Sequence, residues 1–93
     1  MEENKFEWDE TKNSSNIDKH KIDFDFASRV FSDNRRIEWE DDRTDYGEIR
    51  FVTIGKIMNA LITVVYTMRD KIIRIISARP AKINERDLYN NQN

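Results

Sequence analysis

The sequence has no cysteine and very little histidine, glycine or proline. Its 93 residues include one histidine, two glycines and one proline. Without cysteine, disulfide bonds and thiolate metal sites are excluded. Gly47 and Gly55 are too far apart to form a glycine-rich phosphate loop. A single histidine also makes a transition-metal site unexpected, so we predict that the protein uses no metal and no cofactor.

Long apolar runs are absent as well. None approaches the roughly 20 residues that a membrane-spanning helix needs, and the first eight residues, MEENKFEW, are too acidic for a secretory signal. We therefore predict a cytoplasmic protein without membrane contact. The length predicts a single domain over residues 1–93, with frayed ends at residues 1–4 and 90–93.

Charge is divided unevenly along the chain. Residues 1–48 carry 15 acidic and 8 basic side chains, residues 49–93 carry 3 acidic and 8 basic ones, and the formal net charge is −2. A basic C-terminal half could face nucleic acid. The plainer explanation is that the two halves neutralise each other on folding. Charge alone favours this explanation, because net acidic chains are not typical free nucleic-acid binders.

The N-terminal part predicts a strand followed by an unusually polar helix. Residues 5–9, KFEWD, alternate as in a short strand. Asp9 or Thr11 can then cap a helix over residues 11–20. Ile17 is its only large apolar residue, so this helix must be held by its flanks or by a partner. One face collects four polar residues at helical spacing: Lys12, Asn16, Lys19 and His20.

The remaining elements predict an α+β protein. Asp23 can cap a second helix, whose apolar stripe faces the core: Phe24, Ala27, Val30 and Phe31. Strands are predicted at residues 37–40, 49–57, 61–68 and 72–78, the last three joined by hairpin-length connectors. A third helix over residues 81–90 would bury Ile83, Leu88 and Tyr89. The predicted order is β-α-α-β-β-β-β-α.

Arginines in the strands are the first candidates for chemistry. Strict alternation places Arg74 on one face of its apolar strand, with Ser77 and Arg79 on the other. Because an unpaired cation is costly in such a strand, Arg74 either pairs with a carboxylate such as Glu48 or faces solvent. Alternatively, Arg74 or Arg79 holds a phosphate, which suits the planar guanidinium. Residue type leaves both explanations open.

Two further patterns are compatible with nucleic acid. Arg50 and Lys56 share one face of a strand and Tyr66 ends another run, so an exposed sheet face could hold single-stranded RNA. His20 can transfer protons near neutral pH, although a lone histidine is more often structural. An acidic turn within EWEDDRTD could take Mg²⁺, but a solvated turn fits it better.

Three stretches together resemble the BrnT family of toxins: FEWDETKNSSNIDKHKIDFDFASRVF, DDRTDYGEIRFVTIGKI and VVYTMRDKIIRIISARPAKINERDLY. The most specific pieces, in order, are Trp8, Asp9, Lys12, Asn16, Lys19 and His20, then Arg43, Tyr46, Gly47, Glu48 and Arg50, then Arg74, Ser77, Ala78, Arg79, Glu85 and Arg86. Lys21 departs from the pattern, because the family usually has glycine there. If that glycine ends the helix at positive φ, lysine is strained.

The resemblance implies a RelE-like fold, with an antiparallel sheet, two N-terminal helices and one C-terminal helix. It also implies a ribonuclease that inhibits translation and is neutralised by a BrnA-like ribbon-helix-helix antitoxin. Two toxins and two antitoxins would form a heterotetramer, which contacts operator DNA only through the antitoxin. The alternative is a non-catalytic binding or co-repressor subunit that acts only within the antitoxin complex.

Metal-independent RNA cleavage by the 2′-hydroxyl needs a base, an acid and cations near the phosphate. We predict that the first helix lays its polar face beside the basic residues of the sheet. The predicted catalytic residues are His20, Glu48, Arg74 and Arg79. The predicted RNA-binding residues are Lys12, Lys19, Arg50, Tyr66 and Ser77.

Overall fold

The computed structural model describes residues 4–42 and 45–92. Residues 1–3 and 93, which belong to the predicted frayed ends, lie outside the described residues, and so does Arg43. The elements are β1 (Phe6–Trp8), α1 (Glu10–His20), α2 (Phe24–Ala27), the 3₁₀ helix η1 (Ser28–Ser32), β2 (Ile37–Asp41), β3 (Arg50–Ile57), β4 (Ala60–Arg69), β5 (Ile72–Pro80) and α3 (Ile83–Asn90). The predicted α+β class and order are confirmed, with η1 continuing the second helix. None of the helices in the described part is long and apolar enough to cross a membrane.

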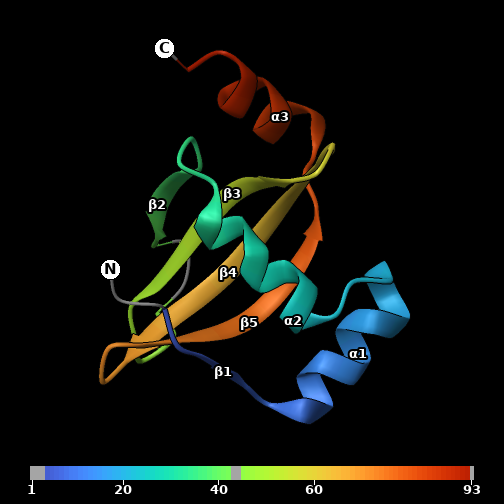
Figure 1. Ribbon diagram of the computed structural model, residues 1–93. Coiled ribbons are helices and arrows are strands. Elements are labelled where there is room, and N and C mark those ends of the chain that lie inside the picture. The colour runs from blue at the N-terminus through green and yellow to red at the C-terminus, as the bar shows by residue number, and fades with distance from the viewer. Residues whose placement is uncertain (1–3, 43–44, 93) are drawn as a thin grey trace.

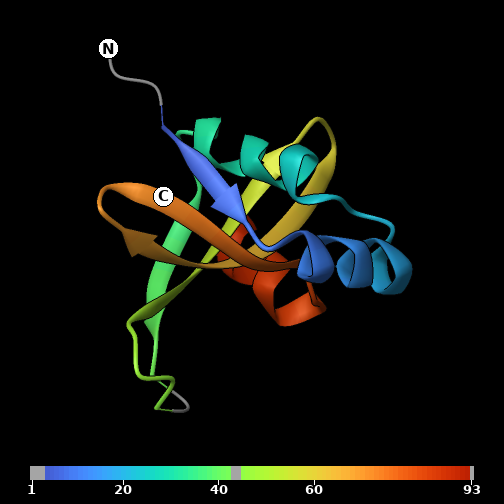
Figure 2. The ribbon, with the colours of Figure 1, turned by 90° about the horizontal axis from the view of Figure 1, so that it is seen from below.

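All five strands form one sheet in the order β1-β5-β4-β3-β2. β1 runs parallel to β5, and the other pairs are antiparallel. α2 and η1 cover one face, and α3 lies on the opposite side of the sheet (Figures 1 and 2). We call the first the core face and the second the open face. The long apolar strand β4 is central, as its sequence predicts.

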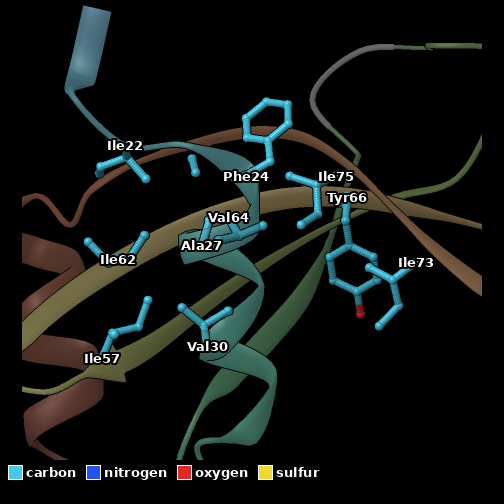
Figure 3. Close-up of a cluster of buried hydrophobic side chains, with 11 residues drawn as sticks. Ile22, Phe24, Ala27, Val30, Ile57, Ile62, Val64, Tyr66, Ile73 and Ile75 are labelled. Atoms are coloured by element: carbon cyan, nitrogen blue, oxygen red, sulfur yellow. The ribbon is translucent and has the colours of Figure 1, made fainter. Parts of the chain in front are cut away.

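The main core lies between the core face and the helices (Figure 3). Phe24, Ala27 and Val30 are fully buried there, which confirms most of the predicted apolar stripe. η1 passes very close to β3 at Gly55. A Cβ atom at this position would lie 2.7 Å from the Cβ of Val30, so a side chain here would push the helix away from the sheet.

Hydrogen bonds, rather than apolar burial, hold α1 in place. Asp9 caps the helix by accepting from the Lys12 amide at 3.1 Å. Asn16 is only 6% exposed. Its side-chain amide donates to the carbonyl oxygens of Ile22 at 2.9 Å and Ala78 at 2.8 Å, and it accepts from the Ala78 amide at 3.1 Å. The polar helix, predicted to need its flanks or a partner, is thus fastened to its C-terminal flank at Ile22 and to β5 at Ala78.

β5 contains a bulge that the sequence pattern does not reveal. Tyr66 pairs with Ile75, but its neighbour Val65 pairs with Ser77, which leaves Ile76 as an extra residue. An extra residue reverses the alternation of side chains beyond it. Ser77 and Arg79 therefore lie on the same open face as Arg74, and the prediction that they face the opposite way is wrong.

The buried side of α3 also differs from the prediction. Ile83 is 79% exposed and Leu88 is 55% exposed, whereas Glu85 and Tyr89 are buried. The Tyr89 hydroxyl donates to Asp33 Oδ2 at 2.6 Å, and Glu85 contacts the sheet. α3 thus attaches through polar contacts, which an apolar periodicity cannot predict. Just beyond it, the Gln92 side chain donates to the Arg35 carbonyl at 2.6 Å.

Lys21 ends α1 in the left-handed conformation that glycine adopts more readily than other residues. It has φ 60° and ψ 29°, and its amide donates to the Ile17 carbonyl at 2.8 Å. An L-residue in this region is strained by roughly 1–2 kcal/mol. Replacement by glycine removes that strain but adds unfolded-state entropy of about 0.4–1 kcal/mol.

We predict that Lys21→Gly raises the free energy of unfolding by about 0.5–1 kcal/mol, because the relieved strain exceeds the added entropy. Urea unfolding measures this change. The matched control is Ser14→Gly, an exposed position inside the same helix, which should lose about 0.5 kcal/mol. Equal losses in both variants would show that the backbone at Lys21 is not strained.

Candidate nucleic-acid interface

Strand register aligns polar residues across the open face in what we call the arginine row: Glu7, Arg74, Thr67, Arg50 and Asp41. Thr67 on the central strand has one arginine on each side. Since neighbouring strands lie about 4.8 Å apart, the Cα atoms of Arg50 and Arg74 are separated by roughly 10 Å. Two guanidinium groups are thereby carried by one face of rigid strands.

Each arginine of the row is held by a carboxylate. Arg74 Nη1 lies 2.7 Å from Glu7 Oε2, and Arg50 Nε lies 3.1 Å from Glu48 Oε2. Pairing with a carboxylate was one of the alternatives for Arg74, and the structure shows such a pair, with Glu7 and not Glu48 as the partner. The two arginine side chains keep 26% and 21% of their surface exposed. Their remaining N–H donors are therefore oriented but still partly accessible.

The guanidinium of Arg50 is also stacked on an aromatic ring. Its Cζ lies 3.9 Å from the centre of the Tyr46 ring. Stacking leaves the planar edge of a guanidinium available for hydrogen bonds. Glu48 additionally lies 3.7 Å from Arg69, an exposed ion pair that contributes little to stability. Arg50 thus has its position fixed from two sides.

A groove of about 260 Å³ runs between α1 and β5. We call it the lysine groove, and its lining residues are Thr11, Lys12, Ser15, Asn16, Lys19, Ile76 and Ser77. The structure thus brings together three of the predicted RNA-binding residues, Lys12, Lys19 and Ser77. His20 is the last residue of α1, half-buried and not part of this lining.

Tyr66 does not join the other candidates. It pairs with Phe51 and so points to the core face, whereas Arg50 points to the open face. Only 5% of it is exposed, between the rings of Phe31 and Phe51. Burial and the hydrogen bond from its hydroxyl to Glu38 raise the pKa of Tyr66. The expectation that it shares an RNA-facing surface with Arg50 does not fit this position.

Arg79 is engaged by α3. Its Nη1 and Nη2 atoms donate to Glu85 at 2.7 and 2.8 Å, and the Thr63 hydroxyl donates to the same carboxylate at 3.0 Å. The hydrogen bonds from Arg79 lower the pKa of Glu85 to about 2. Bidentate pairs of this kind fix geometry as well as charge. The pair therefore fastens α3 to the end of the sheet.

Sequence reasoning missed Glu7 and Thr67. The alternation of Glu7 with Phe6 and Trp8 could have placed it on the polar face of its strand. Its partner depends on the parallel pairing of β1 with β5, which no local pattern reveals. Within residues 4–42 and 45–92, no group of three histidine, aspartate or glutamate side chains is arranged to hold a metal ion.

Fold and site together define a small α+β protein with arginines on one open sheet face and lysines on the helix beside it. A family model described as the ribonuclease toxin BrnT of type II toxin-antitoxin systems matches residues 8–85. The match spans most of the chain, and the protein therefore belongs to the BrnT family. Membership implies a cognate antitoxin as partner. A search against curated proteins finds no match.

The Arg79–Glu85 pair makes stability depend on pH. Because the pKa of Glu85 falls from 4.5 to about 2 on folding, its contribution is complete above pH 4.5 and disappears as the pH falls towards 2. We predict that Glu85→Gln costs roughly 1–3 kcal/mol at pH 7 and progressively less below pH 4.5.

Urea unfolding of the natural protein and of the Glu85→Gln variant at pH 7, 4 and 3 measures this dependence. The control variant is Asp87→Asn, which removes a carboxylate from an exposed position of the same helix. It should leave the unfolding free energy within about 0.5 kcal/mol. A Glu85→Gln deficit that is the same at all three pH values would contradict the ion-pair account.

Proposed function

We propose that this toxin is an endoribonuclease that binds RNA across the arginine row and the lysine groove, cleaves it, and thereby inhibits translation in the cytoplasm. The observation that carries the proposal is the bulge at Ile76, which turns Ser77 to the face that bears Arg50 and Arg74. Basic residues from α1, β3 and β5 then surround one accessible surface. Family membership supports the ribonuclease class.

Electrostatics favour a phosphate chain on this surface. Arginine forks bind phosphate oxygens in pairs, and Lys12 and Lys19 add point charges along α1. Among the described residues that line the lysine groove, none is acidic. A strand of RNA can therefore follow the groove and place one phosphate between Arg50 and Arg74. If phosphate oxygens replaced Glu7 and Glu48 as hydrogen-bond acceptors, Arg74 and Arg50 would both stay hydrogen-bonded.

The proposed reaction uses the RNA's own 2′-hydroxyl as nucleophile. Its oxygen bonds to the adjacent phosphorus while its proton passes to a protein base. The bond from phosphorus to the 5′-oxygen breaks, and that oxygen takes up a proton, which leaves a 2′,3′-cyclic phosphate and a 5′-hydroxyl. The arginines stabilise the extra negative charge that the phosphorane carries.

Two side chains are candidates for the base. Glu48 is the one that we assign, because its carboxylate lies 3.1 Å from Arg50 Nε at the end of the arginine row. His20 is the second candidate, one residue beyond the Lys19 that lines the groove. We assign Arg79 to the attachment of α3, since both of its terminal nitrogens contact Glu85. Glu48→Gln and His20→Gln, compared in one cleavage assay, distinguish the two bases.

We also propose that the antitoxin is a BrnA-like ribbon-helix-helix protein. Two copies of each chain would form the complex, and operator DNA would be contacted only through the antitoxin. The alternative function is a non-catalytic co-repressor subunit with the same basic surface. Incubation of the purified toxin with end-labelled RNA in EDTA separates the two, since only the enzyme gives discrete products.

For the cleavage surface, we predict that Arg50→Ala and Arg74→Ala each slow RNA cleavage by about a hundredfold, because each removes a cation beside the reacting phosphate. Both should also relieve the growth arrest caused by the toxin alone. Arg29→Ala is the control, because Arg29 lies over the Phe26 ring on the helices of the core face. Circular dichroism and thermal unfolding must show that all three variants are folded. Cleavage at the natural rate by both folded arginine variants would place the active site elsewhere.

A further inference from the structure

A second hollow lies beside the arginine row on the open face. This cleft of about 210 Å³ is lined by Trp39, Glu40, Asp41, Asp42, Val52, Val65, Arg79 and Glu85. Trp39, Val52 and Val65 are consecutive partners across β2, β3 and β4, so they form an apolar floor. We call it the Trp39 cleft. Its apolar residues distinguish it from the lysine groove, where the RNA is proposed to lie.

In the part of the chain that the structure describes, the rim of the Trp39 cleft carries more carboxylates than cations. Among the described lining residues, Asp41, Asp42 and Glu85 carry carboxylates and Arg79 is a cation, whereas Glu40 pairs with Phe51 and so directs its side chain to the core face. Arg79 is already paired with Glu85, and Asp41 accepts a hydrogen bond from the Tyr46 hydroxyl at 3.3 Å. Asp42 is exposed. Such a rim repels phosphates and attracts a cation, so the cleft and the lysine groove suit different ligands.

Trp39 gives the cleft a side chain suited to protein contact. It is 39% exposed, and exposed tryptophans contribute strongly to binding when a partner covers them. It stands on β2, the strand at one end of the order of the described sheet. An aromatic side chain and an apolar floor do not suit a small inorganic cation. They fit a peptide segment that combines apolar and basic side chains.

We propose that the Trp39 cleft is a docking site for the cognate antitoxin. The antitoxin would place an apolar side chain on Trp39, Val52 and Val65, and a flanking lysine or arginine against Asp42. The proposal rests on the antitoxin that family membership implies, and not on the RNA chemistry proposed above. The two proposals can therefore fail independently.

Docking at this cleft accounts for neutralisation by simple occlusion. Trp39, Val52 and Val65 each lie two residues along their strands from Asp41, Arg50 and Thr67, respectively. Two residues of a strand span about 7 Å. A segment seated on the apolar floor would therefore extend over the arginine row and exclude RNA from it.

The test measures the affinity of the antitoxin for toxin variants. The probe is the purified protein encoded by the short reading frame beside the toxin gene. Trp39→Ala tests the apolar floor, and Asp42→Lys tests the rim. The control is Asp18→Lys, which makes the same change of charge at an exposed position of α1. Sedimentation velocity of each toxin variant alone is recorded in parallel.

We expect both cleft variants to weaken antitoxin binding at least tenfold, while the control stays within twofold. In cells, the cleft variants should still arrest growth and should escape rescue by the antitoxin. A loss of less than tenfold in either cleft variant would overturn the proposal. It would also be overturned if Trp39→Ala changed the self-association of the toxin and left antitoxin binding intact, because a second toxin copy would then occupy the cleft.

Discussion

The hydrogen bonds between the Asn16 side chain and the backbone of Ala78 are the contact on which the lysine groove depends. β1 pairs with β5 only as far as Trp8 and Ile75. At Ala78 the amide of Asn16 both donates and accepts, as a neighbouring strand would. Loss of a buried partner costs about 1–3 kcal/mol for each group left unsatisfied. One side chain thereby fixes α1 against the sheet and creates the lysine groove beside Ser77.

The bulge at Ile76 acts together with this contact. It brings Arg74, Ser77 and Arg79 onto one face, where each of the three side chains has a different role. Arg74 stands in the arginine row with Arg50, Ser77 lines the lysine groove, and Arg79 fastens α3 through Glu85. The carboxylates that line the Trp39 cleft lie on the same face, separate from the lysine groove.

Local patterns in the sequence were sufficient to predict the elements of the fold. Alternation and apolar runs predicted the strands. Asp9, one of two candidate caps with Thr11, and Asp23 predicted where two helices begin. The bulge could not be predicted, because one extra residue leaves no local trace and yet reverses every later side chain. The polar attachment of α3 was missed for a related reason: Glu85 is buried by a partner that only the folded sheet presents. Tyr66 was placed on the wrong face because its register with Phe51 is a tertiary property.

The central claim is that RNA binds the open face along the arginine row and the lysine groove. Its most direct test is an NMR titration of the toxin with a short RNA whose 2′-hydroxyls are methylated, so that it can bind without being cleaved. The account predicts that the largest amide shifts fall on Arg50, Thr67, Arg74 and Ser77 and on Lys12 to Lys19 of α1. Shifts confined to α2 and η1, or centred on the Trp39 cleft, would contradict it.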